Sequence, residues 1–148
     1  MMDRILARVE ADDRWRALTD AARPEPDPTS AGAIAAAARQ VARTIGAKAI
    51  AAFTATGSTA LRVARERPNR PILGLTPAEA TARRLGVVWG VHPVVVPELH
   101  SMSEMVASAL RVAQAEGFAK PGEEVVVTAG MPLGIPGNTN ALRVAAVK

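Results

Sequence analysis

The stretch "KAIAAFTATGSTALRVARERP", residues 48–68, places a strand, a turn and a helix in immediate succession. Residues 49–53 form a short, fully apolar run, which is typical of a strand in the core of a parallel sheet. Residues 60–67 are amphipathic and rich in arginine, and Pro68 ends the helix that this pattern predicts. Such a unit is half of a strand-helix-strand crossover, so it favours an α/β fold.

The rest of the chain repeats this alternation. Asp27 or Ser30 is expected to cap a helix that ends at Gly46. Further helices are predicted over residues 1–11, 77–85 and 101–117, and further strands over residues 71–75, 92–97, 123–130 and 141–147. The sequence therefore predicts a three-layer α/β sandwich with a five-stranded, mostly parallel sheet flanked by helices, in which the last strand lies near an edge.

Three local signals mark the boundaries of these elements. The segment "RPEPDPTS", residues 23–30, alternates three prolines with other residues and is expected to be a linker. The segments "TPAE", residues 76–79, and "SMSE", residues 101–104, each place a glutamate three positions after a hydroxyl residue. This spacing predicts capping boxes at the starts of two helices, with Thr76 and Ser101 as the caps.

The composition excludes several classes of function. The 148 residues suit one domain, and the absence of cysteine excludes disulfides, thiolate metal sites and cysteine nucleophiles. The net charge of +4 comes with scattered arginines and only 3% aromatic residues, so we expect no nucleic-acid partner. Without an apolar run of membrane-spanning length or a secretory signal, a cytoplasmic protein with no membrane partner is expected.

The turn between the first strand and its helix is the strongest candidate for a binding site. A strand-to-helix turn of this kind lies at the carboxyl end of a parallel strand, where ligands bind in open α/β sheets. Gly57 allows close approach of the backbone, and the helix start presents free N–H groups and about half a positive charge. The predicted phosphate-binding residues are Thr54, Ala55, Thr56, Gly57, Ser58 and Thr59. The alternative is that Ser58 or Thr59 merely caps the helix, and Arg62 is either a further phosphate contact or a surface residue.

A second candidate segment is "GMPLGIPGNTNALRV", residues 130–144. Its glycines and prolines form a loop of partly preset shape after a core strand. Asn138, Thr139 and Asn140 either close over a ligand bound at the turn or satisfy backbone groups within a long loop. We favour a lid over a plain turn.

The sequence offers no catalytic constellation. His92 and His100 lack a clustered carboxylate or cysteine, so they are interpreted as structural and no metal site is predicted. The turn has neither the Gly-Lys-Ser/Thr of a phosphate-binding loop nor the Gly-x-Ser-x-Gly of a hydrolase elbow. Trp89 is expected to pack in the core or at an interface.

The segments "GAKAIAAFTATGSTALRVARERPNRPILGLTP", "TARRLGVVWGVHPVVV" and "EGFAKPGEEVVVTAGMPLGIPGNTNALRV" resemble, in order and over nearly the whole chain, the C-terminal part of pyruvate kinase. The resemblance implies that residues 1–22 are the remnant of the last helix of that family's catalytic barrel and its connection, followed by the linker 23–30. Residues 31–148 then correspond to the C-terminal domain, an α/β sandwich that binds phosphorylated allosteric effectors and contributes an interface in a homotetramer.

The resemblance also implies roles for individual residues. The turn 54–59 matches the family's effector loop, and the family's effector lid matches Gly134, Ile135, Pro136, Gly137, Asn138 and Thr139. The family's substrate, Mg²⁺ and K⁺ ligands lie in the barrel, so this chain has no catalytic residues or cofactors of its own and is not expected to catalyse.

Differences from the sequences of the family restrict the chemical class of ligand that is expected. Relatives activated by sugar bisphosphates carry basic residues where this chain has Ala55, Ser58, Met105 and Ala109. One anchored phosphate is therefore expected, as in a sugar monophosphate or AMP. The alternatives are an oligomerisation module that joins copies through residues 141–147 without a ligand, or a stand-alone domain that binds a phosphorylated metabolite.

Overall fold

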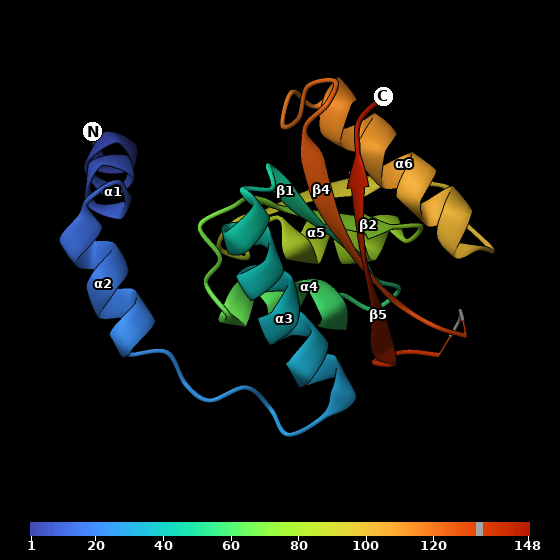
Figure 1. Cartoon of the computed structure of the whole chain (residues 1–148), viewed down its shortest axis with the longest axis horizontal. Helices are drawn as coiled ribbons and strands as arrows, with labels where there is room; N and C mark the ends of the chain where they lie inside the picture. Colours follow the sequence, from blue (N-terminus) through green and yellow to red (C-terminus); the bar gives the residue numbers. More distant parts are fainter. Residues whose placement is uncertain (133–134) are drawn as a thin grey trace.

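The computed structural model describes residues 1–132 and 135–148, which form six helices and five strands (Figure 1). The helices are α1 (Met2–Glu10), α2 (Asp13–Ala21), α3 (Ser30–Ile45), α4 (Ser58–Arg65), α5 (Glu79–Leu85) and α6 (Met102–Ala115). The strands are β1 (Ala49–Phe53), β2 (Ile72–Thr76), β3 (Val91–Val95), β4 (Glu124–Gly130) and β5 (Thr139–Ala146). From β1 to β4 strands and helices alternate, and β5 follows β4 without a helix between them, both as the sequence predicts.

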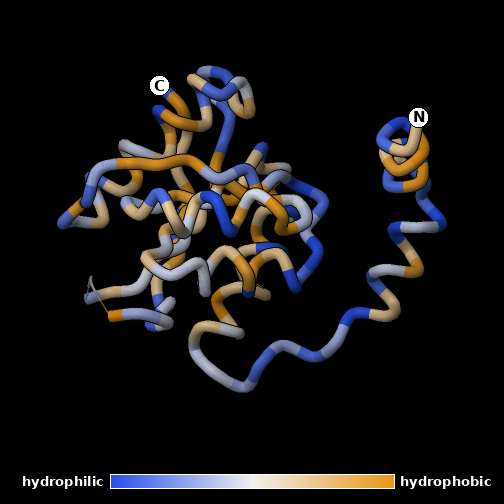
Figure 2. The backbone as a smooth tube through the Cα atoms, turned by 180° about the vertical axis from the view of Figure 1, so that it is seen from behind, coloured by the Kyte–Doolittle hydropathy of each residue, from blue (hydrophilic) through white to orange (hydrophobic). Residues whose placement is uncertain are grey.

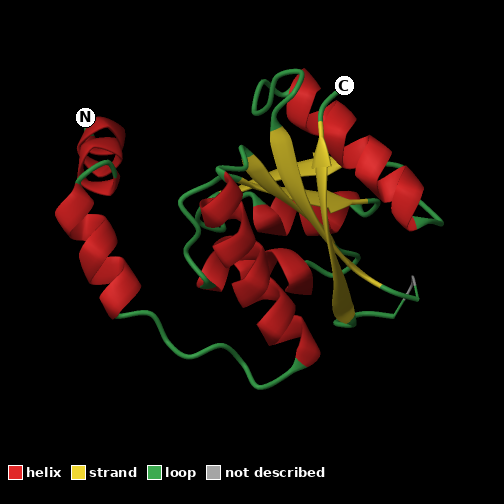
Figure 3. Ribbon diagram, viewed as in Figure 1, coloured by secondary structure: helices red, strands yellow, loops and turns green. Residues whose placement is uncertain are grey.

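The five strands form one sheet in the order β3-β2-β1-β4-β5 (Figure 3). Strand β1 pairs in parallel with β2 and β4, and β2 pairs in parallel with β3. Only β5 is antiparallel, pairing with β4 from Glu124 opposite Ala146 to Gly130 opposite Thr139. The expected mostly parallel sheet with the last strand at an edge is confirmed.

Helices cover both faces of this sheet, which makes three layers (Figure 1). Side chains alternate along β1, so Ile50 and Ala52 point to the face covered by α3, α4 and α5, whereas Ala49, Ala51 and Phe53 point to the face covered by α6. All five residues of β1 are buried, as are all five of β2. Each buried core therefore depends on the central strands, and the sheet fixes where their carboxyl ends lie.

Residues 1–22 differ from the expectation of one helix and a connection. They form two short helices, α1 and α2, because Asp12 caps a second helix by accepting a hydrogen bond from the Arg14 amide at 2.7 Å. Helix α1 exposes its apolar side chains, and Figure 2 shows these hydrophobic residues at the N-terminus, away from the sheet. Neither helix buries a residue, and polar contacts link each to the domain: Glu10 of α1 accepts from the Trp89 indole, and Asp20 of α2 pairs with Arg39.

Two of the predicted helix starts need correction. Thr29, and neither Asp27 nor Ser30, caps α3 by accepting from the Gly32 amide at 3.1 Å. Thr76 is the last residue of β2, and its hydroxyl accepts from the Ala78 amide at 3.2 Å, so α5 begins at Glu79 without a side-chain cap. A hydroxyl two residues before an amide forms a turn as readily as a cap, and burial of Thr76 in the sheet decides between them.

The start of α6 follows the prediction. Ser101 caps it by accepting from the Glu104 amide at 3.2 Å, and the Glu104 carboxylate accepts from the His100 amide at 2.8 Å. The capping box is therefore present, with its return bond one residue further out than usual. No helix in the described parts of the chain is both long and apolar enough to cross a membrane.

Candidate functional site

The turn after β1 takes its shape from hydrogen bonds of its own side chains. The Gly57 amide donates to the Thr54 hydroxyl at 2.8 Å, which closes the turn, and Gly57 has a φ of 97°. A residue with a Cβ is strained at this angle, so the glycine is required by the backbone. Thr54 is buried and shapes the turn, yet its hydroxyl still has a proton to donate.

Helix α4 begins directly after this turn and has no side-chain cap. Its N-cap is Gly57, whereas α3 and α6 are capped by Thr29 and Ser101. The first intrahelical bond is that of the Leu61 amide to the Gly57 carbonyl, so the amides of the first turn have no acceptor among the described residues. The alternative that Ser58 or Thr59 merely caps the helix is therefore wrong, because neither side chain caps α4.

Contacts from α5 hold the turn from behind. The Thr81 hydroxyl donates to the Ala55 carbonyl at 2.9 Å, and the Arg84 guanidinium donates to the Thr56 carbonyl at 3.5 Å. Both carbonyl oxygens are thereby engaged by α5. The hydroxyls of Thr56 and Ser58 lie 3.4 Å apart, and both residues line the cavity described below.

The segment after β4 reaches the same place. The hydroxyls of Thr59 and Thr139 lie 2.6 Å apart and are buried, which joins the start of α4 to the start of β5. Thr139, predicted as part of a lid, is thus a fixed anchor at the base of this segment. The Asn138 amide group donates to the Met131 carbonyl at 3.1 Å, and the Met131 amide donates to the Asn140 side chain at 2.8 Å. The predicted lid residue Gly134 lies outside the described residues.

A cavity of about 260 Å³ lies between the turn and this segment. It opens at the carboxyl ends of β1, β2, β3 and β4, which share one edge because these strands are parallel. The chain leaves β1 toward β2 and leaves β4 toward β5 on the other side, so the two loops diverge and leave a crevice. The sheet topology thus places a cavity where open α/β sheets bind ligands.

The lining brings together most of the residues predicted from sequence. From the turn come Thr54, Ala55, Thr56, Ser58 and Thr59, and from the later segment Gly130, Ile135, Pro136, Gly137, Asn138 and Thr139. Gly57 contributes backbone shape only. Arg62 lies outside the lining, so it is not a contact of this cavity.

Residues 96–100, after β3, were not predicted to take part. Val96, Glu98, Leu99 and His100 line the cavity beside Met105 of α6. The predicted strand "HPVVVP" could have indicated their role, because the loop that follows a third parallel strand lies at the same edge of the sheet as the turn. His92, by contrast, lies away from the cavity and pairs with Glu116, its Nε2 atom 2.9 Å from the carboxylate.

The chemistry of the lining suits binding of one small anion. No lysine or arginine lines the described part of the cavity, and Glu98 adds a negative charge at its exposed rim. No group of three or more His, Asp or Glu side chains within residues 1–132 and 135–148 could hold a metal ion. The polar groups left for a ligand are therefore backbone amides and hydroxyls, which can bind an oxyanion without a metal ion.

Comparisons with known proteins agree with this geometry. Residues 32–145 match the family described as pyruvate kinase, alpha/beta domain. The chain is 45% identical over 146 residues to the pyruvate kinase of Methylorubrum extorquens, covering 99% of this chain and 30% of that protein. It is 39% identical over 148 residues to pyruvate kinase 2 of Synechocystis, covering 100% of this chain and 24% of that protein.

A solved structure extends the likeness to the fold. The crystal structure of a pyruvate kinase from Cryptosporidium parvum matches with a TM-score of 0.74 and 26% identity, covering 84% of this chain and 24% of that one. The chain therefore spans less than a third of the length of these relatives.

Proposed function

Because the chain belongs to the pyruvate kinase alpha/beta domain family, we propose that it is a regulatory module that binds a phosphorylated small molecule at the turn of residues 54–59. The uncapped start of α4, which opens into the cavity, is the observation that carries this proposal. Two other helices of the same domain have hydroxyl caps, so the missing cap at Gly57 leaves donors for a ligand.

The lining favours a ligand with a single phosphate. Amides of the first turn of α4 and the hydroxyls of Thr56 and Ser58 supply enough donors for one phosphate group. A second phosphate would need a lysine or arginine side chain, and the described lining contains neither. The Glu98 carboxylate would also repel the second phosphate. A sugar monophosphate or AMP fits these requirements better than a sugar bisphosphate.

The parent reaction is proposed from the family. In a whole pyruvate kinase it is phosphoryl transfer from phosphoenolpyruvate to ADP, and we assign this chain a regulatory part in it within the cytoplasm. The 148 residues alone are expected to have no turnover. A coupled assay for pyruvate formation on this chain tests that statement, and measurable turnover would contradict it.

Isothermal titration calorimetry tests the binding site. AMP, ribose 5-phosphate, glucose 6-phosphate and fructose 1,6-bisphosphate are titrated into the chain, and a monophosphate is expected to bind most tightly. Gly57→Asp should abolish binding, because a side chain is strained at a φ of 97° and would press against Leu85 and Thr81 of α5, which distorts the turn. Gly117→Asp is the matched control, since Gly117 also has a positive φ, 77°, and lies outside the cavity. Binding of none of the four ligands, or equal loss in both variants, would refute the proposed site.

A second function is favoured by the position of β5. This strand of eight residues is an edge of the sheet, and Val144 on it is 37% exposed. A long edge strand pairs readily with a second copy of itself across a two-fold axis. Sedimentation should therefore show a dimer that Val144→Lys weakens and Val87→Lys, at an exposed position away from β5, does not. A monomer at high concentration would rule out this interface.

A further inference from the structure

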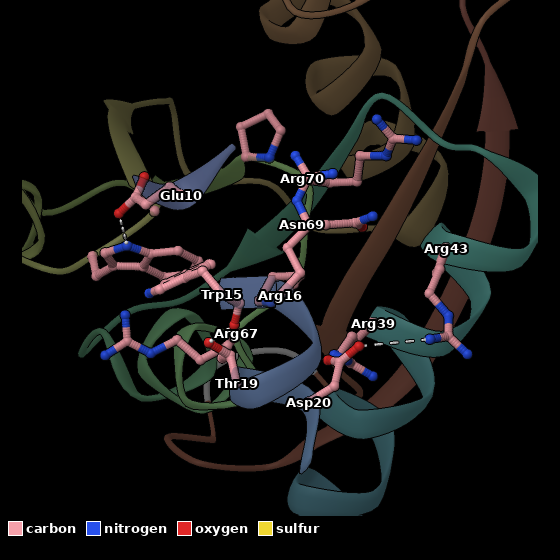
Figure 4. Close-up of a pocket in the computed structure, with 14 residues that line it drawn as sticks. Glu10, Trp15, Arg16, Thr19, Asp20, Arg39, Arg43, Arg67, Asn69 and Arg70 are labelled. Carbon is pink, nitrogen blue, oxygen red and sulfur yellow. Dashed lines mark hydrogen bonds and ion pairs between the residues drawn. The ribbon is translucent and has the colours of Figure 1, made fainter. Parts of the chain in front are cut away.

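A second cavity, of about 300 Å³, lies between the N-terminal helices and the α/β domain (Figure 4). Its walls come from the end of α1, from α2 and α3, from the loop before β2 and from the turn before β3. Figure 4 shows the labelled side chains of α2 and α3 together with Arg67, Asn69 and Arg70 of the loop before β2. It opens far from the carboxyl ends of the strands, and the described linings of the two cavities share no residue.

The charge of this cavity is strongly positive. Five arginines line it against two acidic residues, namely Arg16, Arg39, Arg43, Arg67 and Arg70 against Glu10 and Asp20. The first cavity has no arginine or lysine in its described lining. An excess of three positive charges around one hollow is the electrostatic signature of an anion site.

Asp20 satisfies only part of this charge. It pairs with Arg39 and lies 3.9 Å from Arg43, as Figure 4 shows. The Arg39 side chain is only 8% exposed, and its Nε atom is buried without an acceptor among the described residues. The Nε atom of Arg70 is in the same state. A guanidinium group has five N–H donors, and no hydrogen bond with the described residues uses the terminal nitrogens of Arg70, so a ligand in the cavity can accept from them.

The cavity also has aromatic walls. Both tryptophans of the chain, Trp15 and Trp89, line it. The Arg67 guanidinium lies 4.5 Å from the centre of the Trp89 ring, and Arg67 reaches this position with a φ of 49°, which is uncommon outside glycine. The Trp89 indole donates to the Glu10 carboxylate at 2.9 Å, which fixes the plane of the ring.

From this combination we propose that the cavity is a second ligand site, which takes an organic anion that joins a flat ring to a phosphate group, as a nucleoside monophosphate does. The phosphate accepts hydrogen bonds from Arg70 and Arg39, and the ring lies against the indole surfaces. The inference does not depend on the proposed effector site, because the two cavities have no lining residue in common among those that the structure describes.

Tryptophan fluorescence tests this site selectively. Since neither tryptophan lines the first cavity, a change in indole emission reports on the second. AMP is the probe, with the indoles excited beyond the absorption of adenine, and adenosine and inorganic phosphate are titrated separately. A saturable change with AMP is expected, with a Kd at least about tenfold lower than for adenosine or phosphate alone. No saturable change, or equal responses to AMP and adenosine, would overturn the proposal.

Variants locate the signal. Arg70→Ala should raise the Kd for AMP about tenfold or more, while Arg111→Ala, which removes the same charge from an exposed position on α6, should leave it unchanged. If circular dichroism shows that Arg70→Ala fails to fold, Arg43→Gln is used, with a rise of at least about threefold expected. An unchanged Kd in the folded variants overturns the proposal.

One further variant separates this site from the first cavity. The Gly57→Asp variant should keep the full fluorescence response to AMP, because Gly57 belongs to the turn of the first cavity. Loss of the fluorescence response in that variant would assign the signal to the first cavity and overturn the proposal of a second site.

Discussion

Replacing Ser58 by aspartate should stabilise the fold and weaken the proposed binding of phosphate at the same time. Ser58 is the first residue of α4, is half-buried and follows an N-cap without a side-chain acceptor. A carboxylate here meets the positive end of the helix dipole and the free amides of the first turn. We expect the free energy of unfolding to rise by about 0.5 kcal/mol.

The same carboxylate occupies the position that the ligand needs. Two unit charges about 6 Å apart, at an effective dielectric constant of about 40 for a half-exposed site, repel by about 1.4 kcal/mol. A dianionic phosphate is therefore repelled by about 2–3 kcal/mol, which is roughly a thirty- to hundredfold increase in Kd. Added salt should reduce this loss, because it screens charges near the surface.

Urea denaturation and calorimetry with the tightest-binding monophosphate measure the two effects. Ser103→Asp is the matched control, because Ser103 is exposed in the first turn of α6 and lies outside the first cavity. Both variants should gain stability, and only Ser58→Asp should lose binding. If Ser58→Asp gains stability and still binds the phosphate with unchanged affinity, the start of α4 is not the phosphate site and the reasoning is refuted.

Three further predictions concern stability. Thr59→Val should reduce the free energy of unfolding by about 1–3 kcal/mol, since it leaves the buried Thr139 hydroxyl without its partner 2.6 Å away. In urea denaturation, the double variant with valine at both positions should recover most of this loss. A double variant as unstable as the sum of the two single variants would contradict this. Gly130→Ala should lower the midpoint of thermal unfolding, because the added methyl group would overlap the backbone oxygen of Asn138. An unchanged midpoint would show that the backbone at Asn138 shifts at no cost in stability. The Lys120 amide, which donates to the Glu123 carboxylate at 2.8 Å, holds the pKa of Glu123 below its usual value. The ionised form is thus favoured in the folded state, so Glu123→Gln should be less stable than the wild type near neutral pH. This difference in the free energy of unfolding should vanish as pH falls through the lowered pKa of Glu123. A difference that persists in acid would refute the stabilising role of the Glu123 carboxylate.

Much of the fold follows from local patterns in the sequence. The apolar run 49–53 and the amphipathic segment after it predicted β1 and α4, and the glycine at position 46 has the left-handed backbone of a helix end. The hydroxyl-rich turn around Gly57 stood out because its polar groups exceed what one helix cap needs. Local patterns failed where one residue type serves two structures, as at Thr76, which ends a strand instead of capping a helix.

The complete lining of each cavity could not be predicted from sequence, because part of it depends on contacts between distant segments. The Thr59–Thr139 pair joins residues 80 positions apart, and the loop after β3 enters the first cavity only because β3, β2 and β1 are parallel neighbours. Likewise Glu10 meets Trp89 across 79 positions to build one wall of the second cavity.

The sequence by itself determined the elements, their alternation and the turn at Gly57, since these depend on backbone preferences and periodicity within about twenty residues. The tertiary structure alone decided which amides stay free, which hydroxyls are already used and where the arginines gather around two tryptophans. The physical reason is that hydrogen-bond partnership and charge density are set by distances in space, and the order of strands in the sheet fixes those distances.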